Sequence, residues 1–332
     1  MTEPVVSKTS LNKKIWNSLK ILIALFLMGY VISRTDLGSL QRTWQMLSRS
    51  WLLLSVGCFV LMVVIKALQY RALIDPQLSF WNVLNIIILQ NAISNFISNT
   101  AGVVSYMSMF RAEHGVKLSR SAVAFIIVKV GDLSAILCML VASLSFVWSQ
   151  VVPVQGLLLF LSIGIFSVLL VFFATLVFRH WFVEILSRFL AWSRLLKVGL
   201  VQRGLEVLKN LSGQDQVVIF RMLLYGFFYS SLYFSCTMAW FYTVIRAFHI
   251  PIDFPAMLFI SAMLQIISFI PIQVFGGLGV SEISSMYLYG LFGVPQAEIS
   301  AALLGIRLYT TLMNAFTLLY IPFGKPRTGT RL

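Results

Sequence analysis

Carboxylate side chains are scarce in this sequence. Its 332 residues include 11 Asp and Glu against 25 Lys and Arg, and none of the acids stands in a D-x-D arrangement. Membrane enzymes that transfer a group to or from a lipid phosphate usually need clustered carboxylates at the membrane surface. The scarcity argues against this class, and we expect no catalytic residues and no enzymatic activity.

Cysteine and histidine are also rare, with three of each. The cysteines lie inside apolar stretches, where they pack as small hydrophobic residues rather than form disulfides. The histidines are scattered, without a second ligand at metal-binding spacing. The sequence has no nucleotide-binding loop either, so we expect no metal and no cofactor. These residues are Cys58, Cys138, Cys236, His114, His180 and His249.

Charged residues make up only 11% of the chain, whereas 59% is hydrophobic and the mean hydropathy is +0.90. A soluble domain does not have this composition. A bilayer core needs about 20 helical residues to cross it, and the sequence predicts an all-α polytopic membrane protein with six full transmembrane helices. The apolar runs are 15–33, 51–65, 121–148, 154–178, 217–245 and 299–321. Lys66 and Arg71, after the second run, are interpreted as snorkelling to the interface.

The first apolar run follows basic residues, as in a signal peptide, but it lacks a small-residue cleavage pattern and further spans follow it. We interpret it as a retained first helix. The formal net charge of +14 is spread over loops beside the apolar runs. Membrane topology therefore explains it better than nucleic-acid binding, and we expect no nucleic-acid partner.

Loop charge sets the expected orientation, because short cytoplasmic loops are enriched in Lys and Arg. The segment 179–216 carries six basic residues against three acids, and both tails are basic. The uncharged loop 149–153 then lies outside. We expect a multi-pass protein of the cell (inner) membrane with both termini in the cytoplasm. One exception is the loop with Arg34, Arg42 and Arg49, which this orientation places outside.

Two further apolar segments, 81–109 and 255–291, are interrupted by polar residues and glycine or proline. Full crossings by both would force the basic segment outside, against the charge rule. We therefore predict two re-entrant broken-helix hairpins, making eight membrane segments in all. Each half then makes three crossings, which inverts the second half relative to the first. The single membrane domain, 1–332, divides into repeats 1–150 and 151–332.

The first hairpin carries three amides at four-residue spacing, Asn91, Asn95 and Asn99, which predicts that they share one helical face. Residues 100–102, ending in Gly102, are expected to break the helix at depth. Only a water-filled or protein-lined site permits such a break. The amides are therefore expected either to line a cavity or to form interhelical hydrogen bonds.

The second hairpin contains Pro271, Gly276, Gly277, Gly279 and Glu282, so one helix is expected to stop there and another to begin. The unpaired N–H groups at a helix start, together with the helix dipole, favour an anionic group. We interpret the stretch as part of a binding site. The alternative is a tight turn at the membrane interface.

Charged residues inside a span are costly, so they usually face a cavity or pair with one another. Lys129 and Asp132 fall near the expected midplane, and their spacing lets them touch. Arg307 lies at a similar depth from the opposite face. These charges either receive a ligand or form structural ion pairs, with Asp132 neutralising Lys129 and Glu282 neutralising Arg307.

The two halves agree in spacing. The separation of Asn99 from Lys129 along the sequence equals that of Gly277 from Arg307. Lys129 and Arg307 are therefore expected to occupy corresponding places in the two repeats.

Within the basic segment, basic residues alternate with aromatic and aliphatic ones over 179–210. This pattern is typical of amphipathic helices that lie on the anionic lipids of an inner leaflet. The alternative is a linker between the two halves.

These features resemble the flippase-like membrane domain of lysylphosphatidylglycerol synthases, over essentially the whole chain. The closest match is PIQVFGGLGVSE at 271–282, followed by Arg307 in the last span. Lys129 and Asp132 look like the Arg and Asp of that family's E-R-x-x-D pattern. Residues 95–102 resemble its first hairpin.

The chain departs from the family pattern at Val128 and Val103, where acids are expected, and at Lys129 in place of arginine. The aminoacyl-transferase domain of the synthases has no counterpart here, so synthesis of an aminoacylated lipid is not implied. The resemblance implies the role of the membrane half, which is moving a lipid or lipid-linked sugar between leaflets.

The leading hypothesis is a membrane transport protein that flips an anionic phospholipid or lipid-linked substrate through a midplane cavity. The alternatives are a membrane enzyme and an accessory scaffold of lipid or lipid-linked glycan biosynthesis. The expected partners are the transported lipid and the anionic lipids beneath 179–216, and no oligomeric state is indicated.

Overall fold

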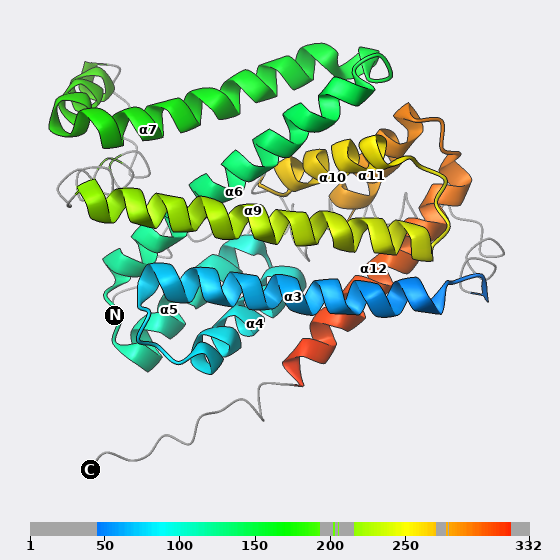
Figure 1. Ribbon diagram of the computed structural model, residues 1–332, viewed down its shortest axis with the longest axis horizontal. Helices are drawn as coiled ribbons and strands as arrows, with labels where there is room; N and C mark the ends of the chain where they lie inside the picture. The colour runs from blue at the N-terminus through cyan, green and yellow to red at the C-terminus, as the bar shows by residue number, and fades with distance from the viewer. Residues whose placement is uncertain are drawn as a thin grey trace, which may run out of the picture. The chain divides into compact units, whose positions relative to one another are not determined.

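The chain folds almost entirely into helices. The computed structural model describes residues 45–192, 202, 205, 216–269, 277 and 279–319, and no strand occurs among them (Figure 1). A helix satisfies its backbone polar groups internally, which a segment in lipid must do. The predicted all-α class is confirmed.

Five helices among the described residues are long and apolar enough to cross a bilayer. They are α3 (Arg49–Ile74), α6 (Leu118–Val147), α7 (Gln155–Trp192), α9 (Gln216–Ala247) and α12 (Gln296–Leu318). They match five of the six predicted runs, and the first, 15–33, lies outside the described residues. The short helix η1 (Val152–Val154) connects α6 to α7.

The apolar run of α7 ends at Phe178, but the helix continues without a break to Trp192. The start of the basic segment 179–216 is therefore a continuation of this long helix. Most of the remainder of that segment lies outside the described residues.

Helix α3 is longer than the run 51–65 predicted for it. It ends at Ile74, so Lys66 lies about two turns inside the helix, and its side chain is only 13% exposed. The interpretation of Lys66 as a snorkelling residue at a span end is therefore wrong. Lysine does not interrupt a helix by itself, and here its charge has a partner within the protein. Arg71 does mark the end of the helix, since its Nε donates to Leu78 O at 2.8 Å.

The first hairpin consists of α4 (Phe80–Phe96) and α5 (Asn99–His114). The predicted break at 100–102 is wrong, because those residues lie inside α5. The break falls one turn earlier, where Ser98 Oγ accepts the Ala101 N–H at 3.2 Å and so caps the new helix. Asn99 consequently begins α5 and does not share a helix face with Asn91 and Asn95.

The second hairpin consists of α10 (Phe254–Ser268) and α11 (Val280–Leu291). Asp253 caps α10, since its Oδ1 accepts the Ala256 N–H at 3.2 Å. Gly277 and Gly279 have φ angles of +81° and +82°, which side chains disfavour. The predicted stop and restart are thus present, and α11 packs against both α10 and α12. Entry of either hairpin into the membrane stays a prediction.

Contacts divide the chain into two compact units, which cut across the order of the sequence. Unit 1 comprises Met1–Phe59, Asn85–Tyr106 and Met238–Leu332. Unit 2 comprises Val60–Leu84 and Met107–Thr237. Unit 1 thus holds both hairpin breaks and all of α12, whereas unit 2 holds α6, α7 and most of α9. The division into repeats at residue 150 stays a prediction.

In unit 1, polar contacts tie the start of α3 to the end of α9 and to α12. The N–H of Ser48 donates to Ala247 O at 3.2 Å. Ser55 Oγ lies 2.6 Å from the hydroxyl of Tyr309, which follows Arg307 closely on α12. The C-terminal span is therefore held to α3 close to its charged residue.

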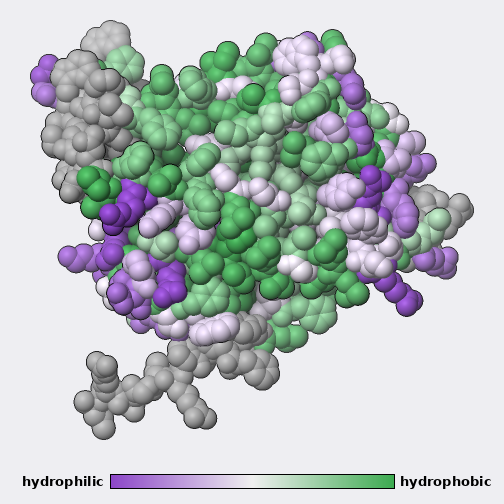
Figure 2. Space-filling model, viewed as in Figure 1, coloured by the Kyte–Doolittle hydropathy of each residue, from purple (hydrophilic) through white to green (hydrophobic). Residues whose placement is uncertain are grey.

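In unit 2, α6 is the most enclosed of the spanning helices. Half of the residues in its most apolar stretch are buried, against 17% in that of α7. The outward side chains of α7 are large and apolar, including Phe160, Ile163 and Phe166. Figure 2 shows hydrophobic side chains over most of the surface in view, with hydrophilic ones mainly toward its left and right margins. Surface of this kind fits the bilayer interior.

Candidate functional site

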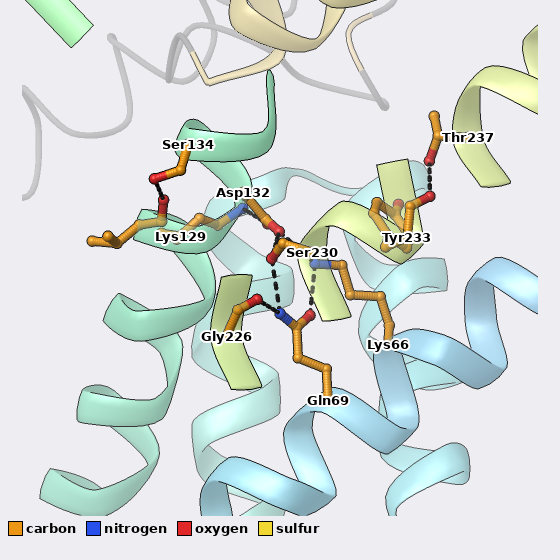
Figure 3. Close-up of polar contacts among 10 residues, drawn as sticks. Lys66, Gln69, Lys129, Asp132, Ser134, Gly226, Ser230, Tyr233 and Thr237 are labelled. Atoms are coloured by element: carbon orange, nitrogen blue, oxygen red, sulfur yellow. Dashed lines mark hydrogen bonds and ion pairs between the residues drawn. The ribbon is translucent and has the colours of Figure 1, made fainter. Parts of the chain in front are cut away.

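A group of polar side chains from α3, α6 and α9 meets inside unit 2 (Figure 3). At its centre, Asp132 Oδ1 accepts hydrogen bonds from Lys66 Nζ and from Ser230 Oγ, both at 2.7 Å. Asp132 is 4% exposed and Ser230 is fully buried. Each of the three helices thus contributes one of these side chains.

Gln69, which is fully buried, completes the hydrogen bonding. Its Oε1 accepts from Lys66 Nζ at 3.0 Å, and its Nε2 donates to Gly226 O at 3.0 Å and to Ser230 Oγ at 2.8 Å. The spacing of Lys66 and Gln69 places them on one face of α3. A buried polar network is stable only when its members are satisfied in this way.

Two glycines bring α6 and α9 together at this point. A Cβ added to Gly131 would lie 2.7 Å from Gly226 O, and one added to Gly226 would lie 2.8 Å from Ile127 Cγ2. Small residues allow such close approach of helices in membranes. Because Gly131 directly precedes Asp132, the approach carries the carboxylate to Ser230.

A second lysine reaches the same carboxylate from α6 itself. Lys129 Nζ lies 3.8 Å from Asp132 Oδ2, and its side chain is 40% exposed, against 13% for Lys66. That distance is an ion-pair contact but too long for a hydrogen bond. Asp132 is therefore bonded primarily to Lys66, and the predicted pairing with Lys129 is the weaker contact. We call Lys66, Lys129 and Asp132 the charged cluster.

The charged cluster lies well inside its helices. Asp132 stands at the middle of α6, which begins at Leu118 and ends at Val147. The ammonium of Lys66 also lies 4.3 Å from the ring centroid of Tyr233, a cation–π contact. Ionisable groups this far inside a spanning helix are expensive unless they are paired, and they mark functional sites by default.

Reasoning from the sequence alone misses Lys66, Gln69 and Ser230 as members of this site. Lys66 falls outside the predicted span, because the apolar run ends at Ile65. A lysine and a glutamine three residues apart are, however, the same kind of signal as Lys129 with Asp132. Ser230 gives no signal of its own, because hydroxyl side chains are common in spanning helices and its partner is 98 residues away.

In unit 1, Glu282 contacts Arg307. Its Oε1 lies 3.7 Å from Arg307 Nε, and its Oε2 accepts the N–H of Gly279 at 2.7 Å. The glutamate is 4% exposed. The carboxylate therefore caps α11 from within the chain. An internal acid thus takes one of the donors at this helix start, and the binding of an external anion there stays a prediction. Pro271 and Gly276 lie outside the described residues.

The amides of the first hairpin also lie in unit 1. Asn95 Nδ2 donates to Asn91 O at 2.9 Å and to Asn314 Oδ1 at 3.3 Å. Asn99 Nδ2 donates to Ser268 O, at the end of α10, at 3.4 Å. The alternative of interhelical hydrogen bonds is thus observed for Asn95. Its partner Asn314 is not predicted from the sequence as a member of this set of amides.

Gly102 has a packing role rather than the expected role of helix breaker. A Cβ there would overlap Ser94 Oγ and lie 3.0 Å from Gln90 O. The glycine therefore lets α5 pass close to α4. Lys129 and Arg307 each stand equally far from the first residue of their helix, but they belong to different units, and their correspondence as members of two repeats stays a prediction.

Comparison with known proteins agrees with this architecture. Among the described residues, no group of three or more His, Cys, Asp or Glu side chains could hold a metal ion. No curated protein matches the chain. The family model described as the lysylphosphatidylglycerol synthase TM region matches residues 17–316, which include both hairpins and every described helix apart from the very end of α12. The chain is therefore a multi-pass membrane protein that belongs to the lysylphosphatidylglycerol synthase TM family.

Proposed function

We propose that the chain moves an anionic phospholipid or lipid-linked substrate between the two leaflets, without making or breaking a covalent bond. The proposal is carried by the charged cluster, in which two ammonium groups share one carboxylate inside spanning helices. A purely structural pair needs only one cation for each acid. The second lysine therefore calls for a functional explanation.

The cluster suits a phosphate group in transit. Lysine binds phosphate as a point charge, and the partly exposed side chain of Lys129 gives an anion access to its ammonium. Lys66 instead holds Asp132 through a hydrogen bond of 2.7 Å. On this proposal Lys129 meets the head group, and Lys66 fixes the carboxylate beside it.

Asp132 supports passage rather than capture. A transported group must bind strongly enough to enter and weakly enough to leave. With its Oδ2 3.8 Å from Lys129 Nζ, the carboxylate repels a phosphate at the same point where the ammonium attracts it. Together the three side chains carry one net positive charge, which favours an anion without holding it tightly.

The test is lipid exchange in reconstituted vesicles. The purified chain is placed in liposomes with a trace of fluorescent anionic phospholipid, and dithionite then bleaches the label in the outer leaflet. A translocating protein makes the inner label accessible too. We expect Lys129→Gln to slow this exchange about tenfold, the effect of one lost hydrogen bond to a charged group.

The matched control is Lys117→Gln, which removes an exposed lysine just before the start of α6 and should leave exchange unchanged. Equal slowing in both variants would contradict the assigned role of Lys129. Wild-type protein that does not accelerate exchange over empty vesicles, for several anionic head groups, would overturn the proposal. A scaffolding role in lipid or lipid-linked glycan synthesis would then be favoured.

A further inference from the structure

A group of amides in unit 1 has hydrogen-bonding capacity that the charged cluster lacks. It comprises Asn95 on α4, Asn99 at the start of α5 and Asn314 on α12, and we call it the amide group. Asn314 is 7% exposed, whereas Asn95 and Asn99 are exposed. Exposed amides are disfavoured in lipid, so they are expected to face a polar ligand or water.

Four of the six amide N–H bonds of the amide group are used within the protein, both of Asn95 and one each of Asn99 and Asn314. Asn95 Nδ2 donates to Asn91 O and Asn314 Oδ1, Asn99 Nδ2 donates to Ser268 O, and Asn314 Nδ2 donates to Thr310 O at 2.8 Å. Within the described part of the chain, no donor reaches the Oδ1 atoms of Asn95 or Asn99. The amide group therefore presents these two acceptor oxygens, together with one further N–H each on Asn99 and Asn314.

Acceptor oxygens select for the chemistry of a ligand. A phosphodiester has no donor, so it can bind only the remaining N–H groups, whereas a hydroxyl can also donate a hydrogen bond to the carbonyl oxygens. An ammonium could donate too, but neutral amides do not balance its charge in a membrane. Glu282, an acid of the same unit, already contacts Arg307. The oxygens of the amide group thus match hydroxyls.

The position along α12 fits an early encounter with the head group. Asn314 lies one turn before the end of the helix at Leu318, about 6 Å along the axis. Arg307 lies two turns deeper on the same face, about 10 Å further in. The amide group therefore meets α12 nearer to the end of that helix than the arginine does.

We propose that the amide group recognises the hydroxyls of a polyol head group, so that the transported lipid is an anionic phospholipid or lipid-linked substrate with free hydroxyls. This inference rests on the proposed function and specifies its substrate class. It adds Asn314 as a positioning residue, which orients Asn95 through the 3.3 Å contact between their side chains.

The test compares fluorescent phospholipids of equal charge in the same vesicle assay. Head groups of glycerol and inositol carry free hydroxyls, whereas a propanol head group has none at nearly the size of glycerol. We expect the glycerol and inositol lipids to exchange about fivefold faster than the propanol lipid, the effect of roughly one net hydrogen bond. In Asn95→Leu and Asn99→Leu, the ratio of the glycerol-lipid rate to the propanol-lipid rate should fall toward one.

The ratio is internal to each preparation, so a loss of folded protein does not change it. Gln155→Leu is the control, because it removes an amide of similar size at the start of α7, in the other unit, and should keep the wild-type ratio. Asn314→Leu should lower the ratio, and Asn314→Gln, which keeps an acceptor, should partly restore it.

The outcomes separate this inference from the proposed function. Equal exchange of the glycerol and propanol lipids by the wild-type chain would overturn the inference while leaving translocation in place. Faster exchange of an ethanolamine lipid than of the glycerol lipid would also overturn it, because the recognised donor would then be an ammonium. If no anionic lipid exchanges, it is the proposed function that fails.

Discussion

Replacing Lys66 by methionine tests the main structural feature of unit 2. The variant removes the cation 2.7 Å from Asp132 Oδ1 and leaves Lys129 at 3.8 Å from Oδ2. At an effective dielectric constant of about 20, the attraction is about 6 kcal/mol at the first distance and about 4 kcal/mol at the second. Breaking a buried pair by removing one partner typically costs about 3–5 kcal/mol. Since Lys129 retains part of the attraction, we expect a loss of about 3 kcal/mol, at the low end of that range.

The assay is thermal unfolding in detergent, followed by tryptophan fluorescence. With the scaling of soluble domains, a loss of about 3 kcal/mol lowers the midpoint by about 6 °C. Asp132→Leu alone should destabilise the chain as well, because it strands the buried ammonium of Lys66. The double variant Lys66→Met with Asp132→Leu removes both charges, so it should be more stable than the sum of the single effects by about 2 kcal/mol.

Additive effects in this cycle would refute the reasoning, since uncoupled residues do not form the pair. Lys117→Met is the control for removing a lysine, and it should leave the midpoint unchanged because that side chain is exposed. A double variant that is stable yet translocates slowly would show that the pair of Lys66 and Asp132 matters for passage as well as for folding.

Two further predictions concern helix contacts. In the same thermal assay, Gly131→Ala should destabilise the chain by about 2 kcal/mol, because its Cβ would meet the backbone oxygen of Gly226 at 2.7 Å. Gly57→Ala is the matched control, because a Cβ there meets nothing within 4 Å. It should stabilise the chain by up to about 1 kcal/mol. Glu282→Gln should lower the stability by about 1 kcal/mol, since it keeps an acceptor for the Gly279 N–H. Glu282→Ala should lower it by about 3 kcal/mol, because it removes both the cap of α11 and the partner of Arg307.

The spanning helices could be predicted because their signal is local. An apolar run of sufficient length specifies a helix in lipid whatever surrounds it, and five of the predicted runs are helices. The predicted position of the first break is wrong because it gives glycine more weight than serine. Gly102 lies inside α5 for packing, while Ser98 supplies the oxygen that starts the helix. Capping residues therefore locate helix starts better than glycines do here.

The contacts of the charged residues could be predicted where the partners lie on one helix or on consecutive helices, as for Glu282 and Arg307. Lys129 and Asp132 are one helical turn apart, and their contact follows from helix geometry. The stronger bond of Asp132, to Lys66, joins residues 66 positions apart. It depends on how α3 packs against α6, which the pattern of a single helix does not encode.

Helices α6 and α12 use the same position along the helix in different ways. Arg307 in unit 1 contacts Glu282, a single acid that also caps a helix. Lys129 in unit 2 contacts Asp132, an acid that already accepts a hydrogen bond from Lys66. The first pair is neutral in itself, whereas the second group has one cation more than its acid needs. An anionic head group should therefore be attracted more strongly by the cluster around Lys129. For this reason exchange of anionic lipids should respond more to removing the charge of Lys129 than to removing that of Arg307.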